Sequence, residues 1–156
     1  AVLGDDDSRI RVFVQVNHAT ALTIPLQQFR IVMEARPALR GLMMRYAQYT
    51  ILQVMFAVVA ASQHLLEARL ARWLLMCHDR SDGDDIRLTH EFMGMMISAQ
   101  RSGVTVALHS LEGAGMIRST RGLVTIRNRE RLADLAGESY GVPEAAYRDL
   151  IAPFGK

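Results

Sequence analysis

The chain has 156 residues, enough for one domain or two small ones with a real core. Half of its residues are apolar, which excludes an intrinsically disordered chain, and its single cysteine excludes an internal disulfide. The formal net charge is only +2, so total charge gives no sign of a nucleic-acid partner. We expect a cytoplasmic protein, because one cysteine suits a reducing compartment and the acidic start at Asp5, Asp6 and Asp7 resembles no secretory signal.

The first part of the chain predicts two short strands and a short helix. Residues 11–16 alternate valines with polar residues, as in a half-buried strand, and residues 21–24 resemble a second strand. Two strands cannot form a stable sheet alone, so residues 1–36 are expected to be the tail of a larger β-domain, from a protein longer than this chain. Pro25 suits the first turn of a helix over residues 26–34.

Residues 37–62, beginning at Pro37, predict a single long helix. Its apolar residues form two rows, so the helix must be covered on two sides. One row has the 3-4 spacing of a coiled coil, which favours pairing with a second copy; an ordinary core helix is the alternative. The residues expected at the dimer seam are Leu42, Tyr46, Tyr49, Gln53 and Phe56. The most apolar stretch, residues 51–61, is too short to span a bilayer, so no membrane contact is expected.

Residues 63–156 predict a compact third region. An amphipathic helix over residues 63–78 is followed by a polar loop and a short apolar strand at residues 86–88. A helix then opens at Thr89, and a sharp break follows at residues 98–99.

A second helix, from about residue 100 to residue 114, follows that break. Gly115 stops it, and strands at 116–119 and 123–126 can form a hairpin. Two helices joined by a tight turn and followed by a hairpin make the winged form of the helix-turn-helix, whose second helix enters the DNA major groove. Near the end of the chain, Asn128 can cap a helix to about Glu138, and Pro143 starts a last short helix that ends near Ile151.

Basic charge collects on this second helix and the hairpin. Between residues 97 and 131 there are six arginines and two acids, a local charge of +4. Phosphates would lie against this surface if the segment binds duplex DNA.

Four sequence segments carry a resemblance to a known family. They are LEARLARWLL at residues 66–75, LTHEFMG at 88–94, VTVAL at 104–108 and LEGAGMI at 111–117. They resemble the cyclic-AMP receptor protein/Fnr superfamily of bacterial transcription regulators, and residues 20–40 look more loosely like the end of that family's β-roll. The resemblance implies a mainly α (α+β) fold, with a β-roll remnant, a dimerisation helix and a winged helix-turn-helix domain.

The same resemblance implies partners and contact residues. The partners would be duplex DNA with a near-palindromic operator, a second copy of the chain, and RNA polymerase. Of the family's Arg, Glu and Arg readers only Arg101 is retained, because Ser102 and Val106 occupy the other two positions. The DNA contacts expected from this match and from the helix pattern are Thr89, Gln100, Arg101, Ser102, Thr105, His109 and Arg121.

Other functions receive little support from the sequence. A catalytic or metal site is not expected, because Cys77 and His78 are adjacent on a helix and point about 100° apart. No cofactor is expected, and Val54 and Met55 stand where cyclic-AMP-binding members carry a Thr-Ser pair, which argues against that effector. Gly103 inside the reading helix indicates either a close approach of another backbone or drift. A winged domain that binds a protein partner instead of DNA remains the alternative function.

Overall fold

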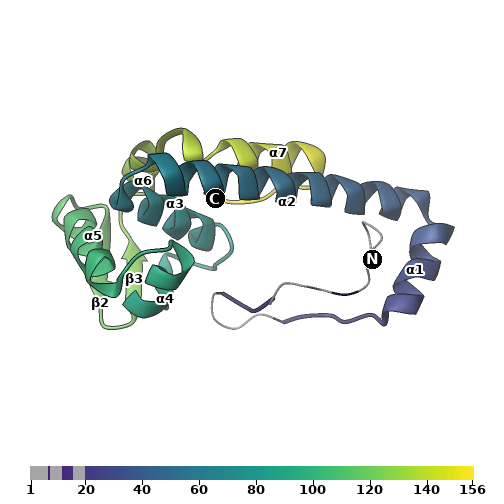
Figure 1. Ribbon diagram of the computed structural model, residues 1–156, viewed down its shortest axis with the longest axis horizontal. Coiled ribbons are helices and arrows are strands. Elements are labelled where there is room, and N and C mark those ends of the chain that lie inside the picture. The colour runs from purple at the N-terminus through teal and green to yellow at the C-terminus, as the bar shows by residue number, and fades with distance from the viewer. Residues whose placement is uncertain (1–6, 8–11, 16–19) are drawn as a thin grey trace.

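The computed structural model describes the chain except residues 1–6, 8–11 and 16–19. It shows a mainly helical α+β fold in which a small sheet and four helices gather at one end of a long helix (Figure 1). The elements in chain order are α1 (Leu26–Ala35), α2 (Pro37–Gln63), α3 (Leu66–His78), β1 (Asp85–Ile86), α4 (His90–Met96), α5 (Arg101–Gly113), β2 (Ile117–Thr120), β3 (Leu123–Ile126), α6 (Arg129–Ala136), the 3-10 turn η1 (Gly137–Ser139) and α7 (Val142–Leu150). Helix α7 lies beside α2, and α1 lies at the other end of α2 from the sheet.

The two strands expected near the N-terminus are not present in the described residues. Residues 12–15 and 20–25 belong to no strand, while the expected strand's ends, Arg11 and Val16, lie outside the described part of the chain. Val12 is 81% exposed and Leu22 is 99% exposed, so neither side chain packs into a core. The alternation of valines was a valid strand pattern, but a strand needs a neighbour to pair its backbone groups, and no described strand lies beside these residues.

The helix-turn-helix has the local chemistry that its sequence predicts. The hydroxyl of Thr89 accepts a hydrogen bond from the backbone N–H of Phe92 at 3.2 Å and caps α4. The turn after α4 is tight: Ala99 N–H donates to the carbonyl of Gly94 at 2.8 Å, and Ser98 has a φ of 53°. A Cβ on Gly94 would lie 2.6 Å from the oxygen of Ala99, so only glycine fits at this position.

One hydrophobic core holds the winged region together. Leu70 and Leu74 of α3 are fully buried, as are Leu108 of α5 and Leu132 of α6. The sheet has the order β1-β3-β2, and all of its pairs are antiparallel. Its inward residues, such as Val124, complete this core, so α5 is held on a rigid base.

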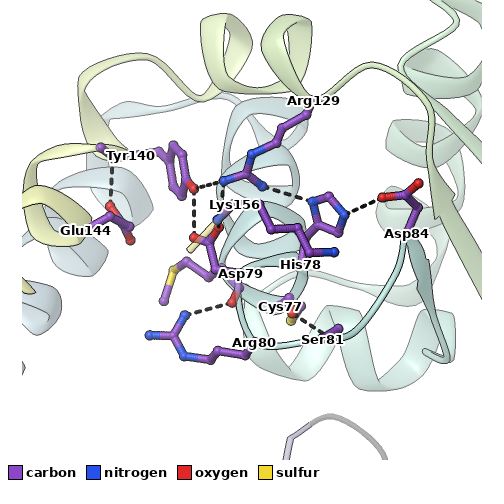
Figure 2. Close-up of polar contacts among 12 residues, drawn as sticks. Cys77, His78, Asp79, Arg80, Ser81, Asp84, Arg129, Tyr140, Glu144 and Lys156 are labelled. Atoms are coloured by element: carbon purple, nitrogen blue, oxygen red, sulfur yellow. Dashed lines mark hydrogen bonds and ion pairs between the residues drawn. The ribbon is translucent and has the colours of Figure 1, made fainter. Parts of the chain in front are cut away.

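A polar cluster joins α3 to the segment after the hairpin (Figure 2). The guanidinium of Arg129, at the start of α6, donates to Asp79 Oδ1 at 2.6 Å, to the Tyr140 hydroxyl at 2.5 Å and to His78 Nδ1 at 2.9 Å. Tyr140 in turn donates to Asp79 Oδ2 at 2.7 Å. Burial and this bond to the Asp79 carboxylate raise the pKa of Tyr140.

The same cluster reaches the loop before β1 through His78. Arginine has no acceptor atom, so Nδ1 of His78 must be the acceptor and its ring hydrogen lies on Nε2. Nε2 then donates to Asp84 Oδ1 at 2.9 Å, and this hydrogen bond lowers the pKa of the Asp84 carboxyl. The cluster thus joins the loop before β1, through Asp84, to the start of α6 after β3, through Arg129.

Candidate nucleic-acid interface

Helix α5 buries one face and exposes the other. Val104, Ala107, Leu108 and Leu111 are at most 1% exposed and face the core. At 3.6 residues per turn, the opposite face carries a row that we call the outer row: Ser102, Val106, His109 and Gly113. All four are exposed, so the helix presents a full side to a partner.

An open groove of about 840 Å³ lies between α5, the start of α4 and the hairpin β2–β3. Of the seven predicted DNA contacts, Thr89, Arg101, His109 and Arg121 line it. Gln100 and Ser102 are exposed at the beginning of α5 but outside the groove lining. The fold therefore brings together residues that are up to 32 positions apart in the chain.

The two arginines of this groove have free side chains. Arg101 and Arg121 are both exposed, and neither guanidinium forms a hydrogen bond or ion pair within the part of the chain that the structure describes. A free guanidinium can donate to two acceptors in parallel, which matches a guanine edge or a phosphate. Arg101 lies on the helix and Arg121 lies at the tip of the hairpin.

Thr105 differs from the other predicted contacts, because its hydroxyl is already bonded inside the domain. It donates to the carbonyl of Arg101 at 3.0 Å, and Nδ1 of His90 lies 2.9 Å from it. The side chain is half-buried and joins α5 to α4. His90 was missed in the sequence, since nothing in the spacing of two residues 15 positions apart indicates this contact.

Glu112 is a second residue that the sequence did not single out. Its Oε1 accepts a hydrogen bond from the backbone N–H of Ser119 at 2.9 Å. This bond fixes the hairpin against α5 and so sets the width of the groove. One sign of this role was present in the sequence: Glu112 is an acidic residue in a segment that is otherwise basic.

The arginines of the basic segment fall into two groups. Arg129 belongs to the polar cluster with Asp79, and Arg131 donates to the carbonyl of Ala114 at 2.6 Å, beyond the end of α5. Arg118 and Arg127 are exposed on and after the hairpin, as Arg121 is. The local charge of +4 is therefore only partly available to a ligand, and of the exposed arginines Arg101 and Arg121 line the groove.

The predicted dimer seam on α2 faces the chain's own α7. Tyr49 is 5% exposed, and its ring centroid lies 4.9 Å from that of Tyr147. Gln53 donates to Glu144 at 3.2 Å and accepts from Arg72 at 3.1 Å, which joins α2 to α7 and α3. In a single copy of the chain these two residues are therefore occupied by contacts within the chain, and their place at a dimer seam stays a prediction. Leu42 and Phe56 are half-buried, and Tyr46 is 50% exposed at the edge of the same face.

The opposite side of α2 is apolar and exposed. We call it the free row, and its members are Met44, Gln48, Ile51, Met55 and Val58. They are spaced 4-3-4-3, the pattern of a coiled-coil seam, and the four apolar members are 48–62% exposed. Val58 also lines a groove of about 270 Å³ that continues toward Trp73 in α3. Heptad spacing is thus present on both sides of α2. Helix α7 of the same chain packs against the side that is richer in aromatic residues.

Helix α2 also bears on the question of a membrane. Among the described residues it is the one helix long and apolar enough to cross a bilayer by length and composition. The sequence estimate considered only residues 51–61 of this helix, which has 27 residues, but length and composition alone do not show that it inserts into a membrane.

Cys77, which was weighed from the sequence as part of a catalytic or metal site, is buried. It is 3% exposed, and burial raises the pKa of its thiol to about 12. A protonated, inaccessible thiol is a poor nucleophile and a poor metal ligand. Within the described residues no group of three or more histidine, cysteine, aspartate or glutamate side chains is placed to hold a metal ion.

Comparison with known proteins places this site in a recognised domain. Residues 68–135, which include most of α3, all of α4, α5 and the sheet, and most of α6, match the model of the Crp-like helix-turn-helix domain. A search of curated proteins finds no match.

Solved structures of similar fold include three bacterial proteins. A CRP-family transcriptional regulator from Thermus thermophilus is 24% identical with a TM-score of 0.52, and the match covers 56% of this chain and 48% of that one. A Crp/Fnr-family regulator from Eubacterium rectale is 23% identical with a TM-score of 0.54, over 72% of this chain and 52% of that one. A CooA variant from Carboxydothermus hydrogenoformans is 16% identical with a TM-score of 0.60, over 72% and 55%. The chain thus spans about half the length of the structures that it matches.

Proposed function

Because this chain carries a Crp-like helix-turn-helix domain of the kind found in Crp/Fnr transcription regulators, we propose that it regulates transcription by binding duplex DNA in a sequence-specific way. Helix α5 enters the major groove, and the hairpin β2–β3 lies on the phosphate backbone beside it. The observation that carries the proposal is the free pair of guanidinium groups, Arg101 on α5 and Arg121 on the hairpin, which line one groove.

The two arginines have different tasks in this proposal. Arg101 lies in the first turn of α5, where side chains of a reading helix reach base edges, and it donates to a guanine. Arg121 and Thr89 contact phosphates, as do the groove-facing His109 and the N-terminus of α4. Gln100 and Ser102 are exposed polar side chains that can reach neighbouring bases. Thr105 acts indirectly by fixing the orientation of α5 through His90.

The active form in this proposal is a homodimer on a near-palindromic operator, in the cytoplasm. The free row of α2 supports a dimer, because an exposed apolar row with coiled-coil spacing needs a partner. RNA polymerase is a further partner of a regulator of this class. We propose no membrane contact, because the other side of α2 is hydrogen-bonded to Glu144 and to Arg72, whose charges would be costly in a bilayer.

Duplex DNA binding by the 156-residue chain tests the proposal. Duplexes selected from a random library are titrated with the wild-type chain and with three variants at several salt concentrations. Arg101→Ala should weaken binding to the selected duplex by about 1–3 kcal/mol and relax one base position. Arg121→Ala should weaken all duplexes alike and reduce the slope of log K against log salt by about one unit.

Arg148→Ala is the matched control, because Arg148 is exposed on α7, away from the groove. It should bind as the wild type does. If no duplex is retained at low salt, the DNA-binding proposal fails and the protein-interaction alternative takes its place. If Arg101→Ala and Arg148→Ala behave alike, the assignment of α5 as the reading helix is wrong.

A further inference from the structure

The outer row of α5 has an apolar side chain at its centre. Val106 is 65% exposed and follows Ser102 by one turn. The helix already buries Val104, Leu108 and Leu111 completely or almost so, and therefore Val106 is not needed for the core. Its neighbours along the outer row are Ser102, which extends little beyond the backbone, and His109 on the other side.

The groups that α5 can offer to a base are few. The Thr105 hydroxyl donates its one hydrogen to the carbonyl of Arg101 and is also bonded to His90, so it has no free donor and one remaining acceptor lone pair. What remains near the start of the helix is the amide of Gln100, the guanidinium of Arg101, the hydroxyl of Ser102 and the isopropyl group of Val106. The first three can form hydrogen bonds, whereas Val106 can make only apolar contacts.

The floor of the major groove offers one apolar group, the C5-methyl of thymine. We propose that Val106 is a specificity-determining residue that selects thymine through contact with this methyl group. The inference rests on the proposed docking of α5 and adds the second base of the half-site. Val106 lies five positions after Arg101, a rise of about 7.5 Å along the helix. At 3.4 Å per base-pair step, the thymine lies about two steps from the guanine read by Arg101.

The test uses the full chain and duplexes selected from a random library. Each thymine of the selected half-site is replaced, one at a time, by deoxyuridine, which removes the methyl group and leaves every hydrogen-bonding group in place. With the wild-type chain, one such replacement about two steps from the Arg101-dependent guanine should lower affinity about fourfold, the effect of losing one buried methyl-sized group. With Val106→Ala, the same replacement should have no effect, because the valine methyl groups are gone.

Two further variants support the reading of this result. Val142→Ala makes the same chemical change at a valine that is 50% exposed on α7, and it should keep the sensitivity to deoxyuridine. Val106→Arg should change the base selected at this position from thymine to guanine, since an arginine there can donate to the guanine edge. Alanine is a better helix former than valine, so weaker binding by Val106→Ala would not come from unfolding of α5.

The possible outcomes separate the two proposals. Sensitivity to deoxyuridine that disappears only in Val106→Ala supports the inference. If wild type and Val106→Ala are equally sensitive, or if no replacement matters in the wild type, the thymine contact is wrong while DNA binding stands. If the library yields no preferred sequence at all, the proposed function fails, and the inference fails with it.

Discussion

At the scale of single residues, two glycines of the winged region differ in their surroundings. A Cβ on Gly94 would lie 2.6 Å from the carbonyl oxygen of Ala99, whereas a Cβ on Gly113 would meet nothing within 4 Å. Gly94→Ala should therefore lower the free energy of unfolding by about 1–3 kcal/mol, because the turn between α4 and α5 must open to make room. Urea denaturation measures the change.

Gly113→Ala is the control for this prediction. It also changes a helical glycine to alanine, but in open space, and it should raise stability by about 0.4–1 kcal/mol. Equal effects of the two substitutions would contradict the tight turn.

How much the sequence could predict also varies from residue to residue. Thr89 and Asn128 were predictable as helix caps, because a cap depends on a side chain and the backbone three residues away. Gly103 was only marked as unusual, and the structure shows that a Cβ there would lie 3.0 Å from Leu66 Cδ2 in α3. Contacts between distant residues, such as His90 with Thr105, left no pattern in the sequence.

At the scale of elements, Arg129 connects α6 to α3 and to η1. The Asp79 side chain is 1% exposed, and Arg129 is its ion-pair partner in the described part of the chain. Arg129→Ala should lower the free energy of unfolding by roughly 3 kcal/mol, the low end for a broken buried pair, because Arg129 itself is 25% exposed. Thermal or urea denaturation checks this value.

Two comparisons make the prediction specific to the ion pair. Arg131→Ala removes a neighbouring exposed arginine with one hydrogen bond to Ala114, and it should cost only about 1 kcal/mol. Adding Asp79→Asn to Arg129→Ala should recover part of the loss, since no unpaired buried charge would remain. Equal losses for the two arginine variants would show that the cluster contributes no special stability.

The helices and strands were predictable where the elements that they pack against lie close to them in the sequence. Helices α3 to α6 and the hairpin were expected close to their observed bounds, because their periodicity, caps and turns agree with one core. The strand predicted from the pattern of residues 12–15 is not formed, because a strand needs a neighbouring strand whose backbone groups pair with its own. Two apolar rows of α2 were predicted, but the second predicted row, from Met43 to Ala61, is not the free row that the structure exposes, so periodicity alone did not identify the exposed side.

At the scale of the whole molecule, the free row of α2 decides the assembly that we propose. Val58→Asp places a charge at a site that is 62% exposed in one copy of the chain, so the fold of that copy should be unaffected. In a dimer the same carboxylate would be buried without a partner, which is strongly unfavourable. We expect the wild type to sediment as a dimer at micromolar concentration and Val58→Asp to sediment as a monomer with weaker DNA binding.

Thr50→Asp is the matched variant for the assembly. Thr50 is also exposed on α2, but on the flank and away from the free row. This variant should remain a dimer. A wild-type chain that is monomeric under these conditions would contradict the assembly, and dissociation by both variants would show that the free row has no special part in it.

Gln48 gives the free row a further property, because it is the one polar member of the row as defined here. Two parallel helices can join their Gln48 amides only when the helices are aligned without a shift along their axes; a slip by one heptad, about 10.5 Å, would leave each amide against an apolar neighbour. The amide therefore acts as an alignment mark. In the proposed dimer it would keep the two copies of α5 at the same distance along the α2 helix axes. Each copy could then read the same sequence on one of the two strands of an inverted repeat.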